Sequence, residues 1–537
     1  MYNVQLNESH FPKQADMLLE QSTVGEILRT TARQYPARHA LSEVDDHGEL
    51  GRSWTYSELL EDAERLATAL STRFRPGERV VIWAPNIPEW ILCEFAFGIA
   101  GITLVTANPG YQPRELAFVI EQSSAAGLFH VEGFRGNPMG EIARKVAAEA
   151  DTLREVIDIA DAQALYATGP FEQRLPVVEP GDIAQIQYTS GSTGFPKGVL
   201  LHHHGLVNNA RHMTELAQLG DGGKSMIIAP LFHTAGCACS VLGAVLRGKH
   251  MHLPRMFDPN LANAIIEKYG IDMFNGVPTM VLLMLEADDA ITRDLTSVEL
   301  IGVGGSMASP EMIRRAKERF DCNFVTVYGL TETSPILTGT RPGDAVRDQT
   351  DTVGQAYPQV ELSIRDPRTN AVMPLDTVGE ICARGYSIMA GYNDNPEATA
   401  EAIDADGWFH TGDLGRMDSR GYVSITGRVK EMIIRGGENL FPVEIENAIL
   451  EHPDVAQVAV VGVDDEILGE IPVAFVRLAD GATLDPDALR AHTRTLLAAQ
   501  KTPAKWVAVK EYPMTGSGKI QKFQLRDKYL AGEYGAA

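Results

Sequence analysis

Short apolar runs alternate with amphipathic stretches along the first three fifths of the chain. Between Thr55 and Leu70 apolar residues recur at helical spacing, and Thr55 with Glu58 forms the sequence of a capping box. A second helix is predicted over Pro310–Phe320, with Ser309 as its N-cap. The runs with the length and composition of buried strands are Val80–Ala84, Ile183–Tyr188, Met226–Ala229, Leu300–Val303 and Phe324–Val327. This alternation predicts an α/β fold with parallel sheets covered on both faces, whose ligands bind at the carboxyl ends of the strands.

The pattern changes twice further along. Residues 350–427 carry short strand-like runs separated by Gly, Asp and Asn turns, which predict a small β subdomain. After Lys430 the pattern predicts helices at Pro442–Glu451 and near Pro486–Ala499, and strands at Val455–Val461 and Pro472–Leu478. We therefore expect an N-terminal domain over residues 1–429 and a compact α+β C-terminal domain over residues 430–537.

The composition of the chain excludes several classes of binding partner and cell compartment. The 537 residues include 47 Lys and Arg against 71 Asp and Glu, a net charge of −24, which argues against nucleic acid or an anionic membrane as the ligand. The five cysteines are an odd number, unlike a disulfide framework, and the pair Cys237 and Cys239 is interpreted as core packing rather than a metal site. The longest apolar run, around Phe95–Ala107, is too short to span a bilayer. Because no basic-then-apolar leader opens the sequence either, these features predict a cytoplasmic protein without an integral membrane segment.

One polar loop indicates phosphate chemistry. Residues 188–198 read YTSGSTGFPKG, directly after the predicted strand Ile183–Tyr188. A Walker loop would need glycine before the lysine and Ser or Thr after it, whereas Pro196 precedes Lys197 and Gly198 follows. No GxGxxG spacing fits these glycines, so the Rossmann fingerprint is excluded as well.

Five motifs in order identify a family resemblance. They are YTSGSTGFPKG (188–198), YGLTETSP (328–335), GWFHTGDLG (407–415), GRVKEMIIRGGENLFP (427–442) and PMTGSGKIQK (513–522). Together they resemble the adenylate-forming superfamily, and within it the acyl-CoA synthetases. The resemblance implies a large AMP-binding domain of α/β subdomains with a β-barrel-like subdomain, and a small mobile C-terminal domain. It also implies a ligase that uses ATP, Mg²⁺ and coenzyme A. A carboxylic acid attacks the α-phosphorus of ATP, and a thiol then displaces AMP from the acyl-adenylate.

The resemblance assigns roles in the adenylation half-reaction. The phosphate-binding loop corresponds to Thr189, Ser190, Gly191, Ser192, Thr193, Gly194 and Lys197, the lysine as a stabiliser of the loop or of pyrophosphate. Thr331 would bind the α-phosphate, and Glu332 would bind Mg²⁺. A carboxylate is a hard oxygen ligand of the kind that Mg²⁺ prefers. Lys519 would neutralise the approach of the two anions. Nucleoside contacts correspond to Gly304, Gly305, Ser306, Tyr328, Gly329, Asp413 and Arg428. Tyr328 is equally compatible with stacking on adenine and with core packing.

The second half-reaction requires Lys519 to withdraw. By resemblance the C-terminal domain rotates about Lys430. The segment Arg435, Gly436, Gly437 and Glu438 would then line the channel for the CoA thiol.

The acyl pocket is expected around residues 230–243 and 274–279. No acidic residue lies in PLFHTAGCACSVLG (230–243), so an α-amino acid would leave its ammonium group unpaired, and an uncharged acyl tail is favoured. Candidate lining residues are His233, Gly236, Cys237, Asn275, Gly276 and Val277. His233 could gate the pocket or steer the carboxylate, or be a satisfied core histidine. Chain length stays open, as does a homodimer. A ligase that loads a carrier protein is the alternative, and the motifs alone also leave open a luciferase-like oxygenase on the same scaffold. The presence of Glu332, Asp413, Arg428 and Lys519 argues against a non-catalytic relative.

Overall fold

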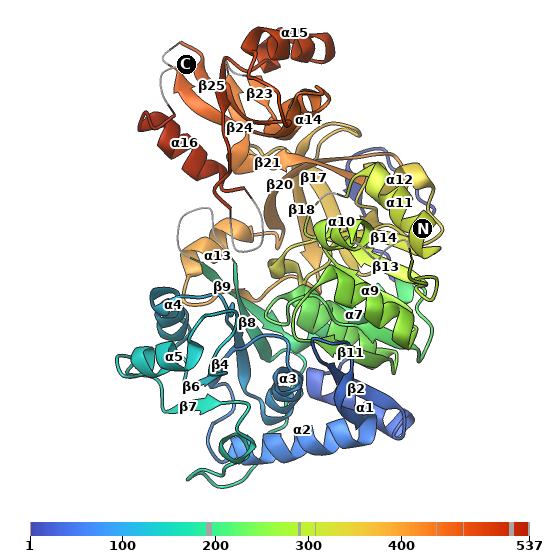
Figure 1. The fold of residues 1–537 in the computed structure, drawn as a ribbon, viewed down its shortest axis with the longest axis vertical. Coiled ribbons are helices and arrows are strands. Elements are labelled where there is room, and N and C mark those ends of the chain that lie inside the picture. The colour runs from blue at the N-terminus through green and yellow to red at the C-terminus, as the bar shows by residue number, and fades with distance from the viewer. Residues whose placement is uncertain are drawn as a thin grey trace.

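Four sheets organise the part of the chain that the computed structural model describes. These residues are 2–189, 196–287, 292–306, 308–435, 438–465, 467–514 and 520–534, with the backbone alone at 438 and 439. The first three sheets and their helices form the bulk of the molecule. The fourth lies at one end of the long axis, in orange and red (Figure 1).

A seven-stranded sheet carries the strands on either side of the YTSGSTGFPKG motif. Its strands, in spatial order, are β19 (Gly391–Tyr392), β9 (Lys197–His202), β8 (Ile183–Thr189), β5 (Thr103–Thr106), β4 (Arg79–Trp83), β6 (Gly127–His130) and β7 (Glu155–Asp158). The strands from β8 to β7 pair in parallel, as the sequence predicts. However, β9 runs antiparallel to β8, so the next described element after β8 is a neighbouring strand instead of a helix.

A nine-stranded sheet lies beside it. Its order is β16 (Gln355–Ala356), β15 (Thr338–Gly339), β14 (Asn323–Tyr328), β13 (Leu300–Val303), β12 (Met273–Gly276), β10 (Lys224–Met226), β11 (His250–Pro254), β2 (His39–Val44) and β3 (Leu50–Thr55). The pairs from β14 to β2 are parallel. The predicted strand Met226–Ala229 ends early, at Met226. The side-chain amide of Asn86 donates to the carbonyls of Ile227 and Ala229, which therefore need no strand partner.

Helices cover these two sheets. They are α1 (Val24–Gln34), α2 (Tyr56–Ser71), α3 (Pro88–Ala100), α4 (Pro113–Ser123), α5 (Met139–Ala147), α6 (Ala162–Leu165), α7 (His203–Leu216), η1 (Ala235–Leu242), α8 (Gly243–Leu246), α9 (Pro259–Tyr269), α10 (Pro278–Glu286), α11 (Pro310–Phe320), η2 (Thr331–Thr333) and α12 (Val346–Asp351). The capping box of Thr55 and Glu58 opens α2, and Ser309 caps α11, as predicted. Among the described residues, no helix has both the length and the apolar character needed to cross a membrane.

An antiparallel sheet follows where the β subdomain was expected. Its order is β1 (His10–Phe11), β17 (Val360–Arg365), β18 (Gly379–Gly385), β20 (Phe409–Met417) and β21 (Val423–Arg428), with α13 (Pro396–Ala402) between β19 and β20. The edge strand β1 comes from the N-terminus, which the sequence pattern did not indicate.

The fourth sheet forms the C-terminal lobe. Its elements are η3 (Val429–Glu431), β22 (Ile433–Arg435), β23 (Glu438–Leu440), α14 (Pro442–Leu450), β24 (Val455–Asp465), β25 (Gly469–Leu478), α15 (Pro486–Leu496), η4 (Ala499–Lys501), β26 (Lys505–Ala508) and α16 (Lys522–Leu530). The helices and strands predicted for this region are all present. β24 and β25 are longer than predicted and pair as an antiparallel hairpin.

Candidate active site

Three parallel strands end at one edge of the nine-stranded sheet and place the nucleoside candidates together. β12 ends at Gly276 and β13 at Val303, which are paired in register. The next residue, Gly304, donates its N–H to the carbonyl of Gly276 at 3.3 Å. β14 ends at Tyr328, and a Cβ on the following Gly329 would lie 1.9 Å from the carbonyl oxygen of Pro335. Glycine is therefore required there by close backbone packing.

Tyr328, Asp413 and Arg428 meet although they lie far apart in the sequence. The Tyr328 hydroxyl donates to Oδ2 of Asp413 at 2.9 Å, and Nε of Arg428 donates to Oδ1 at 3.1 Å. Burial raises the pKa of Tyr328, and the charge of Asp413 raises it further, so the phenol keeps its proton and donates. The structure thus brings the predicted ribose contacts together and ties Tyr328 to them.

Glu332 is buried in the middle of the YGLTETSP segment. It lies in η2, is 8% exposed, and accepts a hydrogen bond on Oε1 from the Tyr392 hydroxyl at 2.9 Å. Its own backbone carbonyl accepts from the N–H of Met389 at 2.8 Å. Burial raises the pKa of Glu332, whereas its backbone N–H, the Tyr392 hydroxyl and the charge of Lys197 act in the opposite direction. A nearly buried carboxylate among oxygen-bearing neighbours suits a hard divalent cation, so these residues fit Mg²⁺.

Lys197 lies over the ring of Tyr392. Its Nζ is 4.6 Å from the centre of the Tyr392 ring, a cation–π arrangement. In the β8–β9 hairpin Lys197 pairs with Thr189, and the two therefore flank the loop. Ser190, Gly191, Ser192, Thr193 and Gly194 lie outside the described residues, as does Lys519. A cavity of about 330 Å³ adjoins this face, lined by Lys197, Tyr392 and the segment Asn393–Asn395 among others.

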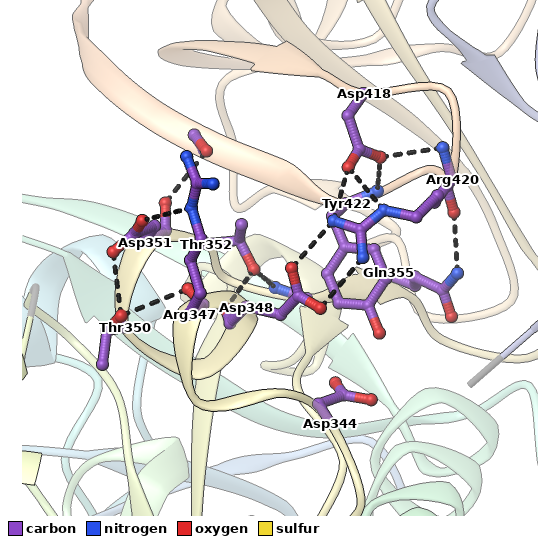
Figure 2. A network of polar contacts seen from close by, with 12 residues as sticks. Asp344, Arg347, Asp348, Thr350, Asp351, Thr352, Gln355, Asp418, Arg420 and Tyr422 are labelled. Carbon is purple, nitrogen blue, oxygen red and sulfur yellow. Dashed lines mark hydrogen bonds and ion pairs between the residues drawn. The ribbon is translucent and has the colours of Figure 1, made fainter. Parts of the chain in front are cut away.

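A polar network fastens the hairpin β20–β21 to the nine-stranded sheet (Figure 2). Arg420, in the turn of the hairpin, donates to both carboxylate oxygens of Asp348 in α12 at 2.8 and 2.9 Å. It also pairs with Asp418 at 2.8 Å, while its backbone carbonyl accepts from the amide of Gln355 at 2.7 Å. Such bidentate pairs fix geometry as well as charge. Because β20 carries Asp413 and β16, which carries Gln355, belongs to the same sheet as β14 with Tyr328, the network ties the hairpin of Asp413 to the sheet of Tyr328.

The acyl-pocket candidates gather around η1, which has π-helical hydrogen bonding of a kind often found at functional sites. His233 is exposed at its start, so the alternative of a core histidine does not hold. Cys237 is buried, and its thiol contacts Gln187 of β8 at 3.2 Å. The amide of Asn275 contacts the hydroxyl of Ser240 at 3.4 Å, and Val277 is 39% exposed at the strand edge.

The chain around Lys430 is bound to a different lobe on each side. Arg428 is held by Asp413 of β20, as described above. Glu431 pairs with Lys522 of α16 at 2.9 Å, and Lys522 also pairs with Glu446 of α14 at 2.8 Å. Val429 and Lys430 therefore lie between a residue that pairs with β20 and a residue that pairs with α16, and the hinge at Lys430 stays a prediction.

The predicted thiol channel is described only in part. Arg435 ends β22 and donates to the carbonyl of Gln500 within the C-terminal lobe. Glu438 is paired with Arg435 through the backbone of β23. Gly436 and Gly437 lie outside the described residues.

Comparison with protein families identifies the chain. The model of the AMP-binding enzyme family matches residues 28–393, and that of the AMP-binding enzyme C-terminal domain matches residues 444–519. The chain belongs to the AMP-binding enzyme family. It is an AMP-forming acyl-CoA synthetase, a ligase that activates a carboxylic acid as its adenylate and uses ATP and CoA.

Similar proteins span nearly the whole length of this acyl-CoA synthetase. The Bacillus subtilis (strain 168) protein YngI, whose name assigns acyl-CoA synthetase activity only provisionally, is 36% identical over 95% of this chain and 97% of its own. The mitochondrial medium-chain acyl-CoA ligase ACSF2 of Rattus norvegicus is 33% identical over 97% of this chain and 89% of its own. The crystal structure of ATP-bound MatB from Rhodopseudomonas palustris superimposes with a TM-score of 0.83 at 26% identity, covering 95% and 99% of the two chains.

Sequence reasoning missed Tyr392, Glu380 and His410. Tyr392 contacts Glu332 across sixty positions of sequence, and only the fold reveals that contact. His410 lies inside the GWFHTGDLG motif, but a histidine in a sequence motif does not reveal which residue it contacts. Its partner Glu380 lies in β18, outside the five motifs.

Proposed function

We propose that this acyl-CoA synthetase activates medium-chain fatty acids and that adenylation takes place between Glu332, the Tyr328–Asp413–Arg428 cluster and Lys197. The observation that carries the proposal is the convergence of these groups from β14, η2, β20, β21 and β9 on one region. The absence of an acidic residue from segment 230–243 favours an uncharged tail. The name of the ACSF2 relatives supports medium length.

Each group has a task set by charge. Asp413, oriented by Tyr328 and Arg428, accepts hydrogen bonds from the ribose hydroxyls. Thr331 contacts the α-phosphate, and Gly304–Ser306 meet the adenine edge. Glu332 holds Mg²⁺, which supplies charge neutralisation at the phosphate oxygens. Thr189, Lys197 and the loop between them take the β- and γ-phosphates.

The C-terminal lobe serves the two half-reactions in turn. Lys519 stabilises the charge that develops as the carboxylate closes on the α-phosphorus. Rotation of the C-terminal lobe about Lys430 then withdraws Lys519 and brings the segment around Arg435 to the site. The lobe thus alternates between two discrete arrangements.

A panel of acids tests the substrate assignment. Straight-chain acids from acetate to stearate, and aryl acids, are each incubated with ATP, Mg²⁺ and CoA, and AMP formation is followed. We expect the highest kcat/KM for acids of medium length and dependence on both Mg²⁺ and CoA. A maximum at acetate or at an aryl acid would refute the chain-length assignment. AMP release that needs the acid but not CoA would favour the loading of a carrier protein.

We also propose that the protein is cytoplasmic. Five cysteines without a disulfide, four of them buried, suit a reducing compartment. Fractionation of the source cells tests this location. Recovery of the protein in the membrane fraction or in an oxidising compartment would contradict a cytoplasmic location.

A further inference from the structure

The motif segment around Asp413 is a bulge in β20. Glu380 of β18 pairs with Leu414, and Cys382 pairs with His410, so Ile381 alone lies opposite Thr411–Asp413. Gly412 has a φ of +73°, a conformation that favours glycine. Bulges re-aim side chains next to functional sites, and this one directs the Asp413 carboxylate toward Tyr328 and Arg428.

Glu380 closes the bulge with both of its carboxylate oxygens. Oε1 accepts a hydrogen bond from the backbone N–H of Gly412 at 3.0 Å, and Oε2 lies 2.8 Å from Nδ1 of His410. Glu380 is 7% exposed, so these bonds are little screened by water. One carboxylate thus joins the backbone of the bulge to the ring of His410.

His410 lies between two carboxylates. On its other side, Nε2 is 3.4 Å from Oδ2 of Asp404, which in turn accepts from the amide of Asn370 at 2.9 Å. The hydrogen bond to Glu380 is the main cause that raises the pKa of His410 above its usual value, and Asp404 adds to it. Cys382 also lies on this face, with its Sγ 3.5 Å from Nδ1 of His410, and the charge of Arg365 acts on its thiol.

We propose that Glu380 and His410 are positioning residues that hold the bulge of β20 and thereby set the affinity of the site for the nucleotide ribose. The proposal rests on the proposed role of Asp413. The protonated imidazole of His410 donates to Glu380, and Glu380 accepts from the Gly412 N–H. The conformation of Gly412 in turn sets the orientation of the neighbouring Asp413.

Glu380, Cys382 and His410 also have the residue types and spacing of metal ligands. Ligand atoms of Glu380, Cys382 and His410 all lie within 4.8 Å of one another. Burial raises the pKa of the Cys382 thiol, so a metal ion bound there would have to displace the thiol proton. The 2.8 Å contact between Glu380 and His410 is accounted for by a proton on the imidazole, and added Zn²⁺ tests the metal alternative.

The clamp has a defined pH dependence. A histidine whose folded pKa is raised contributes its stabilisation fully below the unfolded pKa and loses it as pH rises through the folded pKa. The affinity for nucleotide should therefore fall on the alkaline side of the ordinary histidine range, and it should not fall in this way when position 410 cannot carry a proton.

Binding of AMP to the full-length protein tests the clamp. Calorimetry is run on wild type, Glu380→Gln and His410→Gln between about pH 6 and pH 9. Matched controls are Glu361→Gln and His10→Gln, which remove a carboxylate and a histidine that pair in the same sheet away from the bulge. We expect about tenfold weaker AMP binding for both clamp variants at neutral pH, with the controls unchanged. The alkaline fall in affinity should be present in wild type and lost in His410→Gln.

Asp413→Asn separates the two levels of the proposal. If that variant binds AMP as tightly as wild type, the proposed role of Asp413 fails. If Asp413→Asn binds weakly but the clamp variants bind normally, only the clamp is overturned. A rise in melting temperature with added Zn²⁺ that is lost in Cys382→Ser would also overturn it, because the cluster would then be a metal site.

Discussion

Tyr392 donates its hydroxyl hydrogen to Glu332 across 2.9 Å, while the face of the same ring lies 4.6 Å from Nζ of Lys197. One side chain therefore orients both the proposed Mg²⁺ ligand and the lysine that ends the phosphate loop. Such supporting groups orient the groups that touch a metal ion, and their loss commonly costs about 10–100-fold in metal affinity or activity.

Tyr392→Phe should weaken binding of Mg²⁺–ATP by about tenfold, because the ring stays against Lys197 but Glu332 loses its hydroxyl donor. Tyr392→Leu should weaken it further. Calorimetric titration of ATP with and without Mg²⁺ measures the effect, and only the Mg²⁺-dependent part should change in Tyr392→Phe. The control is Tyr269→Phe, which removes a hydroxyl that donates to the carbonyl of Gly48. An equal loss in the absence of Mg²⁺ would contradict the orientation of Glu332 by Tyr392.

Lys519→Ala should abolish adenylation and spare thioester formation. Its proposed charge serves only the approach of carboxylate to phosphate, and removal of one such preorganised group costs about 10²–10³ in rate. Pyrophosphate release reports the first half-reaction, and conversion of supplied acyl-adenylate with CoA reports the second. Equal loss in both assays would refute the assignment.

Lys430→Pro should show the opposite pattern. Proline fixes φ and stiffens the short segment between Arg428 and Glu431, each of which is held by a different lobe. Thioester formation should fall strongly while pyrophosphate release is retained. Lys430→Ala is the matched control, since it removes the side chain and leaves the backbone free. If Lys430→Pro makes thioester at the wild-type rate, the pivot lies elsewhere.

Glu94→Gln should stabilise the protein progressively as pH rises. Glu94 in α3 is 2% exposed, its Oε1 accepts from Gln185 at 2.8 Å, and its Oε2 has no hydrogen-bond partner among the residues that the structure describes. Burial raises its pKa well above the usual value, so the folded state holds a proton that the unfolded state has released. Stability of the wild type then falls as pH increases above the unfolded pKa, and the glutamine removes that dependence.

Urea unfolding across a pH series measures this difference. Glu121→Gln, at an exposed position of α4, is the control. A constant difference between Glu94→Gln and wild type at all pH values would show that Glu94 stays ionised in the folded protein.

The alternation of apolar runs and helices was sufficient to predict much of the fold. Pro310–Phe320 and Leu300–Val303 have the predicted bounds, because N-caps and buried parallel strands leave strong local signals. The strand at Met226 was predicted too long because the backbone that follows is satisfied by a side chain, Asn86, from far along the chain. Local patterns carry no information about such a partner.

The candidate site could be predicted only one residue at a time. Motifs supplied Tyr328, Asp413 and Arg428, but the hydrogen bonds that join them depend on how two sheets are packed. Tyr392 and Glu380 stand outside the motifs, and their significance comes from the atoms they contact. Pairings over such separations are set by tertiary structure rather than by local preference.

The antiparallel return of β9 beside β8 has a consequence for the charge at this edge of the sheet. A helix N-terminus would present a fixed dipole there, whereas β9 follows as a strand in which Lys197 lies opposite Thr189. The positive charge at this position is therefore carried by a side chain, the Lys197 ammonium group over the Tyr392 ring. A substitution of Lys197 would remove that charge and leave the backbone pairing of the two strands in place.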